Sequence, residues 1–335
     1  MRSAWRTPPT RLNRQDDQVN LFPRMNTLCA ALMMIASASA IAGGDIRFSA
    51  HEAYPEGVAH SAKDKVFLVS SMRYGTIGRV TPGGEYRAFI DDDKLISSVG
   101  MLFDKRHNAL WVAISDPALS TRSTDVTKNR LAAVAVYDAS SGKRRAYHDL
   151  GALVEGGHFA NDLTIDPDGN VYVTDSFSPV IYRVDAKGRK SVFATSDLFK
   201  GEGFNLNGIV YHPDGYLLVA KYNSGELFRV SIGDPKRVEP VALAEPLKGA
   251  DGLVLKSNSQ LTVIQNQGAD SVVELQSNDG WQTAKTASRS KSSMSFPTTG
   301  ARVGKSIYVL NARLDTLLDP KAQKANEYLL QKFDD

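Results

Sequence analysis

Four polar residues, each at the start of an apolar stretch, carry the donor groups of a candidate cation site. They are Glu56, Asn161, Asn207 and Asp251. Their side chains supply two carboxylates and two amide oxygens, with no His or Cys among them. Oxygen donors with two formal negative charges suit a hard divalent cation, with Ca²⁺ as the best match and Mg²⁺ or Mn²⁺ as alternatives. Zn²⁺ fits less well, because zinc sites normally include His or Cys.

Taken singly, each of these residues has a simpler explanation. An Asn-Gly pair before a strand, as at Asn207, is ordinary turn chemistry, and an isolated Asp or Glu can lie on the surface or begin a tight bend. The interpretation as one site therefore depends on whether the chain brings all four residues to equivalent positions.

An internal repeat provides this equivalence. A strand, a turn and a second strand recur in the segments 55–71, 98–115, 161–176, 207–222, 251–266 and 298–312. Most of these segments are followed by a third short strand, and some by a fourth. Six units of four strands predict an all-β fold, a six-bladed β-propeller with four-stranded antiparallel blades. We expect a single propeller domain over residues 43–335, preceded by an N-terminal extension over residues 1–42.

We expect three irregular features in this propeller. The polar segment 115–130 should form a loop between two strands of the second blade. Residues 314–333 should include a short helical piece before the outer strand of the last blade. Residues 45–53 should pair with that blade, which would close the ring and remove exposed sheet edges.

The first strand of each propeller blade lies innermost, so the residues that open these strands should surround the central channel. In chain order they are Glu56, Val99, Asn161, Asn207, Asp251 and Thr298. Val99 offers no donor, whereas four of the other five carry carboxylate or amide oxygens. A glycine follows most of them, and we expect it to keep the channel side clear. The repeat thus predicts a cation site in the channel.

The motifs around these residues resemble those of a known family. PEGVAH, NDLTIDPDGNVYVTD, LNGIVYHPDG and ADGLVL are similar to the metal-ligand motifs of the senescence marker protein, gluconolactonase and luciferin-regenerating enzyme family. The resemblance covers residues 50–312, and related calcium-dependent lactonases and phosphotriesterases share a similar arrangement. It implies that Glu56, Asn161, Asn207 and Asp251 bind a catalytic metal. It also implies hydrolysis of lactones, aryl esters or phosphotriesters, with the cation acting as a Lewis acid.

Such a reaction needs a base to activate water. His158, three residues before Asn161, is one candidate, and Asp251 or Glu56 is another. The alternative for His158 is a loop histidine with no catalytic part. Asp162 and Asp175 could support the site or could hold loops by local hydrogen bonds.

Other function classes remain open at this stage. The alternative to a hydrolase of a small-molecule substrate is a non-enzymatic propeller that binds a ligand or a protein and keeps a structural calcium ion. A strictosidine-synthase-like propeller without a metal is disfavoured, because all four ligand types are present. The sequence contains no G-x-S-x-G, H-E-x-x-H, Walker or dinucleotide-binding pattern.

The charge distribution limits the partners that the protein is expected to bind. The formal net charge of +3 is already present in residues 1–42, so the remainder is neutral and a nucleic-acid or anionic-membrane partner is not expected.

The N-terminal segment indicates an exported protein. Residues 28–35 form a short apolar run followed by small residues at 37–44, as in a secretory signal peptide, and the run is too short to span a membrane. We expect periplasmic or secreted localisation, with Met25 as an alternative start. A buried core helix is the alternative for the run. The only cysteine, Cys29, lies in this leader, so the exported domain would have no disulfides.

Overall fold

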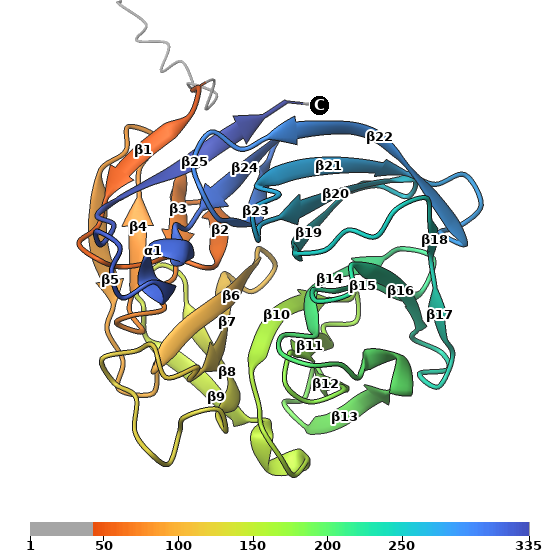
Figure 1. Cartoon of the computed structure of the whole chain (residues 1–335). Coiled ribbons are helices and arrows are strands. Elements are labelled where there is room, and N and C mark those ends of the chain that lie inside the picture. The colour runs from red at the N-terminus through yellow and green to blue at the C-terminus, as the bar shows by residue number, and fades with distance from the viewer. Residues whose placement is uncertain (1–42, 335) are drawn as a thin grey trace, which may run out of the picture. The chain divides into compact units, whose positions relative to one another are not determined.

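Six β-sheets arranged in a ring make up residues 43–334, the part of the chain that this computed structural model describes (Figure 1). Blade 1 contains β2 (Val58–Ser61), β3 (Val66–Val69), β4 (Ile77–Val80) and β5 (Tyr86–Ile90). Blade 2 contains β6 (Ser97–Asp104), β7 (Ala109–Ser115), β8 (Ala132–Asp138) and β9 (Arg144–Asp149). Blade 3 contains β10 (Ala160–Ile165), β11 (Val171–Asp175), β12 (Val180–Val184) and β13 (Lys190–Thr195).

The remaining three blades complete the ring. Blade 4 contains β14 (Leu206–His212), β15 (Tyr216–Lys221), β16 (Glu226–Ser231) and β17 (Val238–Pro240). Blade 5 contains β19 (Ala250–Ser257), β20 (Gln260–Gln265), β21 (Ser271–Gln276) and β22 (Thr283–Lys291), with β18 (Ala242–Leu243) added in parallel to β22. Blade 6 contains β23 (Pro297–Val303), β24 (Ser306–Asn311), β25 (Glu327–Phe333) and β1 (Ile46–Ser49). The predicted six-bladed propeller is therefore confirmed.

The sequence of each strand follows from its place in the blade. A strand in the middle of a blade is covered on both faces by neighbouring blades, so it is apolar along most of its length. β11 reads VYVTD, and all five of its residues are buried. The outer strand β13 reads KSVFAT and alternates exposed with partly buried residues, because one of its faces meets solvent. The core accordingly lies between the blades.

The last blade is built from both ends of the described chain. β1 pairs antiparallel with β25, with Ile46 opposite Leu330 and Phe48 opposite Tyr328. Figure 1 shows the two strands side by side, the first in orange and the last in blue. This pairing is the ring closure expected from residues 45–53, and it covers an edge that would otherwise expose unpaired backbone groups.

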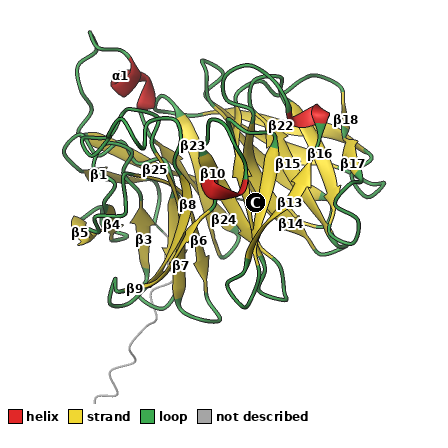
Figure 2. Ribbon diagram, turned by 90° about the horizontal axis from the view of Figure 1, so that it is seen from below, coloured by secondary structure: helices red, strands yellow, loops and turns green. Residues whose placement is uncertain are grey.

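The loop in blade 2 and the short helix in blade 6 also lie within the segments predicted for them. Residues 116–131 connect β7 to β8, and the short helix α1 (Leu314–Leu318) precedes β25. β25 is the third strand of blade 6 and not its outer strand as expected, because β1 takes the outermost position. Two further 3₁₀ turns are η1 (Gly151–Leu153) and η2 (Asp197–Phe199). In Figure 2 the strands run between two loop-lined faces, and α1 projects from one of them. No helix among residues 43–334 is long and apolar enough to cross a membrane.

The glycines that follow the channel residues allow the innermost strands of neighbouring blades to approach each other. A Cβ atom on Gly57 would lie 2.2 Å from the backbone oxygen of Val99, and one on Gly208 would lie 2.1 Å from that of Asp251. Real Cβ atoms do not approach other atoms so closely. Our expectation that these glycines clear the channel side therefore needs correction, because the space they leave is filled by the backbone of the next blade.

We expect Gly208→Ala to lower the free energy of unfolding by about 2 kcal/mol, because the added methyl group overpacks the contact between β14 and β19. Gly233→Ala is the matched control, since no atom lies within 4 Å of its Cβ position. Guanidinium unfolding of both variants measures the difference. Equal stability of the two would contradict the close approach.

Candidate metal centre

The four candidate residues line one cavity, which has a volume of about 210 Å³. Glu56 precedes β2, and Asn161, Asn207 and Asp251 lie in the innermost strands β10, β14 and β19. All four are buried, with relative exposures of 7%, 3%, 4% and 5% in chain order. The structure thus brings together four residues from four blades.

A bulge in each inner strand orients three of these side chains. The strand register shifts between Ala160 and Leu163, between Leu206 and Ile209, and between Ala250 and Leu253. Asn161, Asn207 and Asp251 lie inside these bulges, where the extra residue takes its side chain out of the regular alternation. In blade 1 the regular strand starts only after Glu56, and the Ser70 hydroxyl oxygen accepts hydrogen bonds from the Glu56 and Gly57 backbone amides instead (3.1 and 2.7 Å).

Three oxygen atoms in this cavity are buried without a hydrogen-bond partner. They are Oε2 of Glu56, Oδ1 of Asn161 and Oδ1 of Asn207. Buried polar atoms are almost always paired, and leaving one unpaired costs about 1–3 kcal/mol. Three such atoms around one cavity are positioned to share a common partner, such as a bound cation or an ordered water.

Neighbouring side chains form hydrogen bonds that fix the orientation of Asn161 and Asp251. Nδ2 of Asn161 donates to Oγ of Ser176 (2.9 Å), which leaves Oδ1 as the free end of that amide. Nδ2 of Asn266 donates to Oδ2 of Asp251 (2.6 Å), and the Tyr222 hydroxyl donates to Oδ1 of Asn266 (2.5 Å). Such supporting contacts fix ligand orientation in metal sites.

The cavity contains buried carboxyl groups without a basic partner. Burial raises the pKa of Glu56 well above its ordinary value, and repulsion from Asp251 and Asp162 raises it further. Burial likewise raises the pKa of Asp251, and burial raises the pKa of Asp162 to about 7. No Lys or Arg lies among the described residues that line the cavity. A bound divalent cation would offset this repulsion.

The donor set therefore fits a hard cation better than a zinc ion. Among residues 43–334, no three His, Cys, Asp or Glu side chains cluster as a metal site by themselves. Any ion held here would depend on the two asparagine oxygens together with the two carboxylates, which is the oxygen-rich environment that Ca²⁺ accepts.

The two remaining residues that open inner strands, Val99 and Thr298, offer no free oxygen ligand. Val99 is fully buried. Thr298 donates its hydroxyl to the backbone oxygen of Glu56 (2.7 Å), which links blade 6 to blade 1 beside the site. Thr298 thus supports the position of Glu56.

His158 lies outside the cavity lining and is held inside the protein. Its Nε2 donates to the backbone oxygen of Val154, and its Nδ1 lies 2.9 Å from Oδ2 of Asp175. Acceptors at both ring nitrogens favour the doubly protonated imidazole, which has no lone pair left to take a proton. A role for His158 as the base stays a prediction, and its contacts favour a structural role.

Asp175 holds the loops around His158. Its Oδ1 accepts hydrogen bonds from the backbone amides of Phe159, Phe177 and Ser178, and its Oδ2 accepts one from the Tyr182 hydroxyl. Asp162 differs, because it lies close enough to Glu56 and Asp251 to repel both. Asp175 therefore organises a loop, whereas Asp162 adds charge next to the site.

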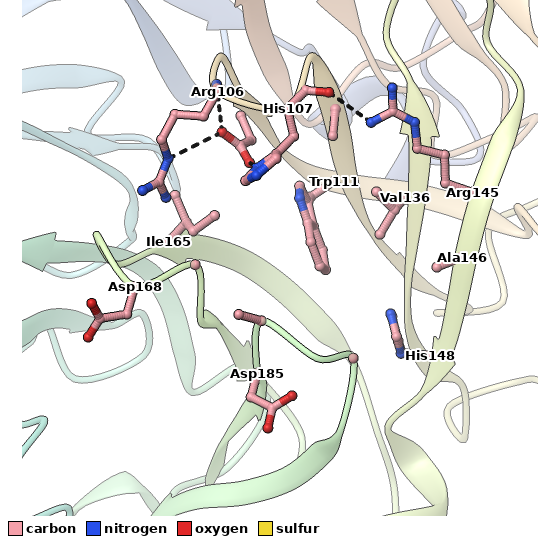
Figure 3. Close-up of a pocket in the computed structure, with 15 residues that line it drawn as sticks. Arg106, His107, Trp111, Val136, Arg145, Ala146, His148, Ile165, Asp168 and Asp185 are labelled. Carbon is pink, nitrogen blue, oxygen red and sulfur yellow. Dashed lines mark hydrogen bonds and ion pairs between the residues drawn. The ribbon is translucent and has the colours of Figure 1, made fainter.

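A larger cavity of about 500 Å³ lies between blades 2 and 3 (Figure 3). Its lining includes Trp111 and His148, whose rings stack with centroids 6.2 Å apart. Asp104 is paired with His107 (2.6 Å), and Figure 3 shows Asp168 and Asp185 pointing in different directions. The described side chains of this lining include one buried, unpaired polar atom, the Nε1 donor of Trp111, and no buried, unpaired oxygen that could bind a cation. The smaller cavity is therefore the stronger candidate site.

Comparison with solved structures shows which proteins share this fold. The major Malassezia sympodialis allergen Mala s 1 is 18% identical, with a TM-score of 0.69 over 87% of this chain and 96% of that chain. Luciferin-regenerating enzyme is 14% identical, with a TM-score of 0.60 over 86% and 95%. The gluconolactonase XC5397 from Xanthomonas campestris is 15% identical, with a TM-score of 0.58 over 86% and 89%.

The chain shares its fold with these propellers. Two of the three are proteins of the kind that the sequence motifs resemble, so the resemblance is supported at the level of the fold. No family model and no curated protein sequence matches the chain. Low sequence identity with a conserved arrangement of strands is common among propellers of different function.

Proposed function

We propose that this protein is a divalent-cation-dependent hydrolase of lactone or ester bonds, with Ca²⁺ as the preferred ion. The observation that carries the proposal is the convergence of three buried, unpaired oxygens and Asp251 on one cavity. The shared fold with a gluconolactonase and luciferin-regenerating enzyme supports the reaction class. Export stays part of the proposal, because the predicted signal peptide falls within residues 1–42, outside the described residues.

In this proposal Glu56, Asn161, Asn207 and Asp251 would hold the cation. When bound, the cation supplies Lewis-acid stabilisation of the negative charge that develops on the carbonyl oxygen. We assign the proton of the attacking water to the Glu56 carboxylate, with Asp251 as the alternative acceptor. Asn266 keeps Asp251 oriented through Oδ2, so Asp251 contributes its fixed charge to the ion site.

The test is turnover of a lactone, an aryl ester and a phosphotriester by the purified protein before and after chelation, and again after Ca²⁺ is returned. We expect chelation to lower kcat/KM at least a hundredfold on one of the first two classes, and Ca²⁺ to restore it. Activity that ignores the chelator would reject the cation-dependent reaction.

The second candidate is a non-enzymatic propeller with a structural calcium ion. It is favoured by one observation, which is that no His or Lys lies among the described residues lining the cavity. Tight Ca²⁺ binding without turnover of any of the three substrate classes would select this alternative.

A further inference from the structure

The walls of the candidate site are apolar to a degree that restricts its substrate. Besides the four oxygen-bearing residues, ten residues line the cavity, and eight of them are apolar. Four come from loops and strand ends and carry large rings or a thioether: Phe159, Phe204, Phe296 and Met72. Four are aliphatic: Pro117 and Leu119 from the loop between β7 and β8, and Leu314 and Leu318 from α1.

The aromatic part of the wall is packed in place. The rings of Phe159 and Phe204 meet edge to face with centroids 5.2 Å apart, and Phe177 packs against both at 5.5 and 5.0 Å. Tyr222 meets Phe204 at 6.3 Å. Because these rings hold one another, an apolar ligand group could bind here with little cost in ordering the wall.

Two apolar side chains of this wall are also open to solvent. Among residues 43–334, only five large hydrophobic side chains are strongly exposed, and Phe204 (38%) and Leu318 (56%) are two of them. Both line this cavity. Exposed apolar groups at the rim of a cavity are typical of ligand-binding sites, where the ligand removes them from water.

The wall has few polar groups, and some of them are already hydrogen-bonded within the protein. The Tyr222 hydroxyl donates to Asn266, and Gln267 is hydrogen-bonded to Tyr222. No Ser, Thr, Lys or Arg lines the cavity among the described residues. A sugar lactone would bury several hydroxyl groups against this wall, and each unmatched hydroxyl weakens binding roughly tenfold or more.

We propose that the substrate is a lactone or ester bearing an apolar acyl or aryl substituent, and that polyhydroxylated lactones are poor substrates. This inference rests on the proposed function for the bond that is broken, but the wall chemistry carries it separately. A cavity of about 210 Å³ is small for a ligand site, so a longer substituent would extend past Phe204 and Leu318 toward solvent. Water adds to the carbonyl carbon and the ring or ester C–O bond breaks, giving a hydroxy acid or an acid and an alcohol.

The test is a substrate series on the full chain in Ca²⁺, with δ-valerolactone, δ-octanolactone, δ-decanolactone and D-glucono-1,5-lactone. We expect kcat/KM to rise about two- to fourfold for each added CH₂ until the wall is covered. We expect D-glucono-1,5-lactone to be at least tenfold poorer than δ-valerolactone. A preference for D-glucono-1,5-lactone, or no gain with chain length, overturns this inference while leaving the hydrolase proposal intact.

Calorimetric titration with the same four lactones separates the two proposals if there is no turnover. Tighter binding of the longer lactones would then support the apolar site and reject the hydrolase. Binding that does not depend on chain length would reject the apolar site.

Leu318→Gln and Phe204→Gln test the two exposed residues directly. Each should lower the ratio of kcat/KM for δ-decanolactone over δ-valerolactone by three- to tenfold, because a polar group replaces the apolar contact. Leu198→Gln is the control, since Leu198 is 41% exposed in η2 and does not line the cavity. If the ratio in the two cavity variants equals that in the control, Phe204 and Leu318 do not contact the substituent. If turnover is absent, the same comparison uses the ratio of binding constants.

Discussion

The Glu56→Gln variant is expected to lose both its calcium-dependent stabilisation and at least a hundredfold of its hydrolytic rate. The substitution removes one of the two formal charges of the donor set and the atom to which we assign the water proton. A cation at a hundred times its dissociation constant adds about 2.7 kcal/mol to the free energy of unfolding of the wild type. That increment should be absent from the variant when thermal unfolding is compared in Ca²⁺ and in chelator.

Without the ion, the same substitution should not lower the free energy of unfolding and should even raise it. In chelator, Glu56 is a buried carboxyl group that is repelled by Asp251 and Asp162. A neutral amide of the same shape removes that repulsion, so the variant should be at least as stable as the wild type and up to about 2 kcal/mol more stable.

Glu202→Gln is the matched control for both conditions. It makes the same change of charge at an exposed position in the loop before β14. It should therefore keep the wild-type response to Ca²⁺. A calcium response in Glu56→Gln equal to that of this control would remove Glu56 from the ion site.

The fold could be predicted from the sequence because a propeller repeats one short-range pattern. Each blade is a strand, a turn and another strand, and the turns carry strong signals, such as the PDG sequence that ends at Gly169 with a φ of 86°. The irregular pieces were also visible, since a polar insertion such as 115–130 interrupts the period. Local patterning and the global architecture agree in this chain.

The common cavity of Glu56, Asn161, Asn207 and Asp251 could be predicted because equivalent positions in a sequence repeat become neighbouring positions around the propeller axis. The sequence alone assigns no role to the supporting residues Ser176 and Asn266, although both occupy equivalent positions in the repeat. Ser176 lies 15 residues after Asn161, and Asn266 lies 15 residues after Asp251. Each ends or follows the second strand of its unit and so faces the bulge in the first. A polar residue 15 positions after the residue in the bulge is therefore the sequence signal for such a supporting contact.

The apolar wall could not be predicted from the repeat. Phe204 comes from a loop, Phe296 precedes β23 at a φ of 55°, and Leu318 comes from a five-residue helix. None of these lies in the periodic part of a blade, so their common cavity depends on loop conformations without a sequence period. The role of the glycines was misjudged for a related reason, because the distance between neighbouring inner strands is a property of the packed ring.

The His158→Ala variant is expected to lower the free energy of unfolding by about 3 kcal/mol at pH 6 and by less at pH 9. The hydrogen bond to Asp175 raises the pKa of His158 above its ordinary value of 6.5, so the folded protein binds this proton more tightly than the unfolded chain. The stabilisation is therefore complete below pH 6.5 and is lost as pH rises through the raised pKa. Removing the ring also leaves buried Asp175 without its cationic partner, which is the costly way to break such a pair.

Denaturant unfolding across this pH range, together with kcat/KM under conditions where the variant is folded, separates the two roles of His158. A structural residue gives the stability loss with activity reduced only a few-fold. A catalytic base gives a loss of more than a hundredfold in kcat with the unfolding free energy nearly unchanged, and that result would restore the catalytic prediction. His51→Ala is the control, because His51 is exposed and bonded to the neutral side chain of Asn326 (2.9 Å). Since both nitrogens of His158 already face acceptors inside the protein, we expect the structural outcome.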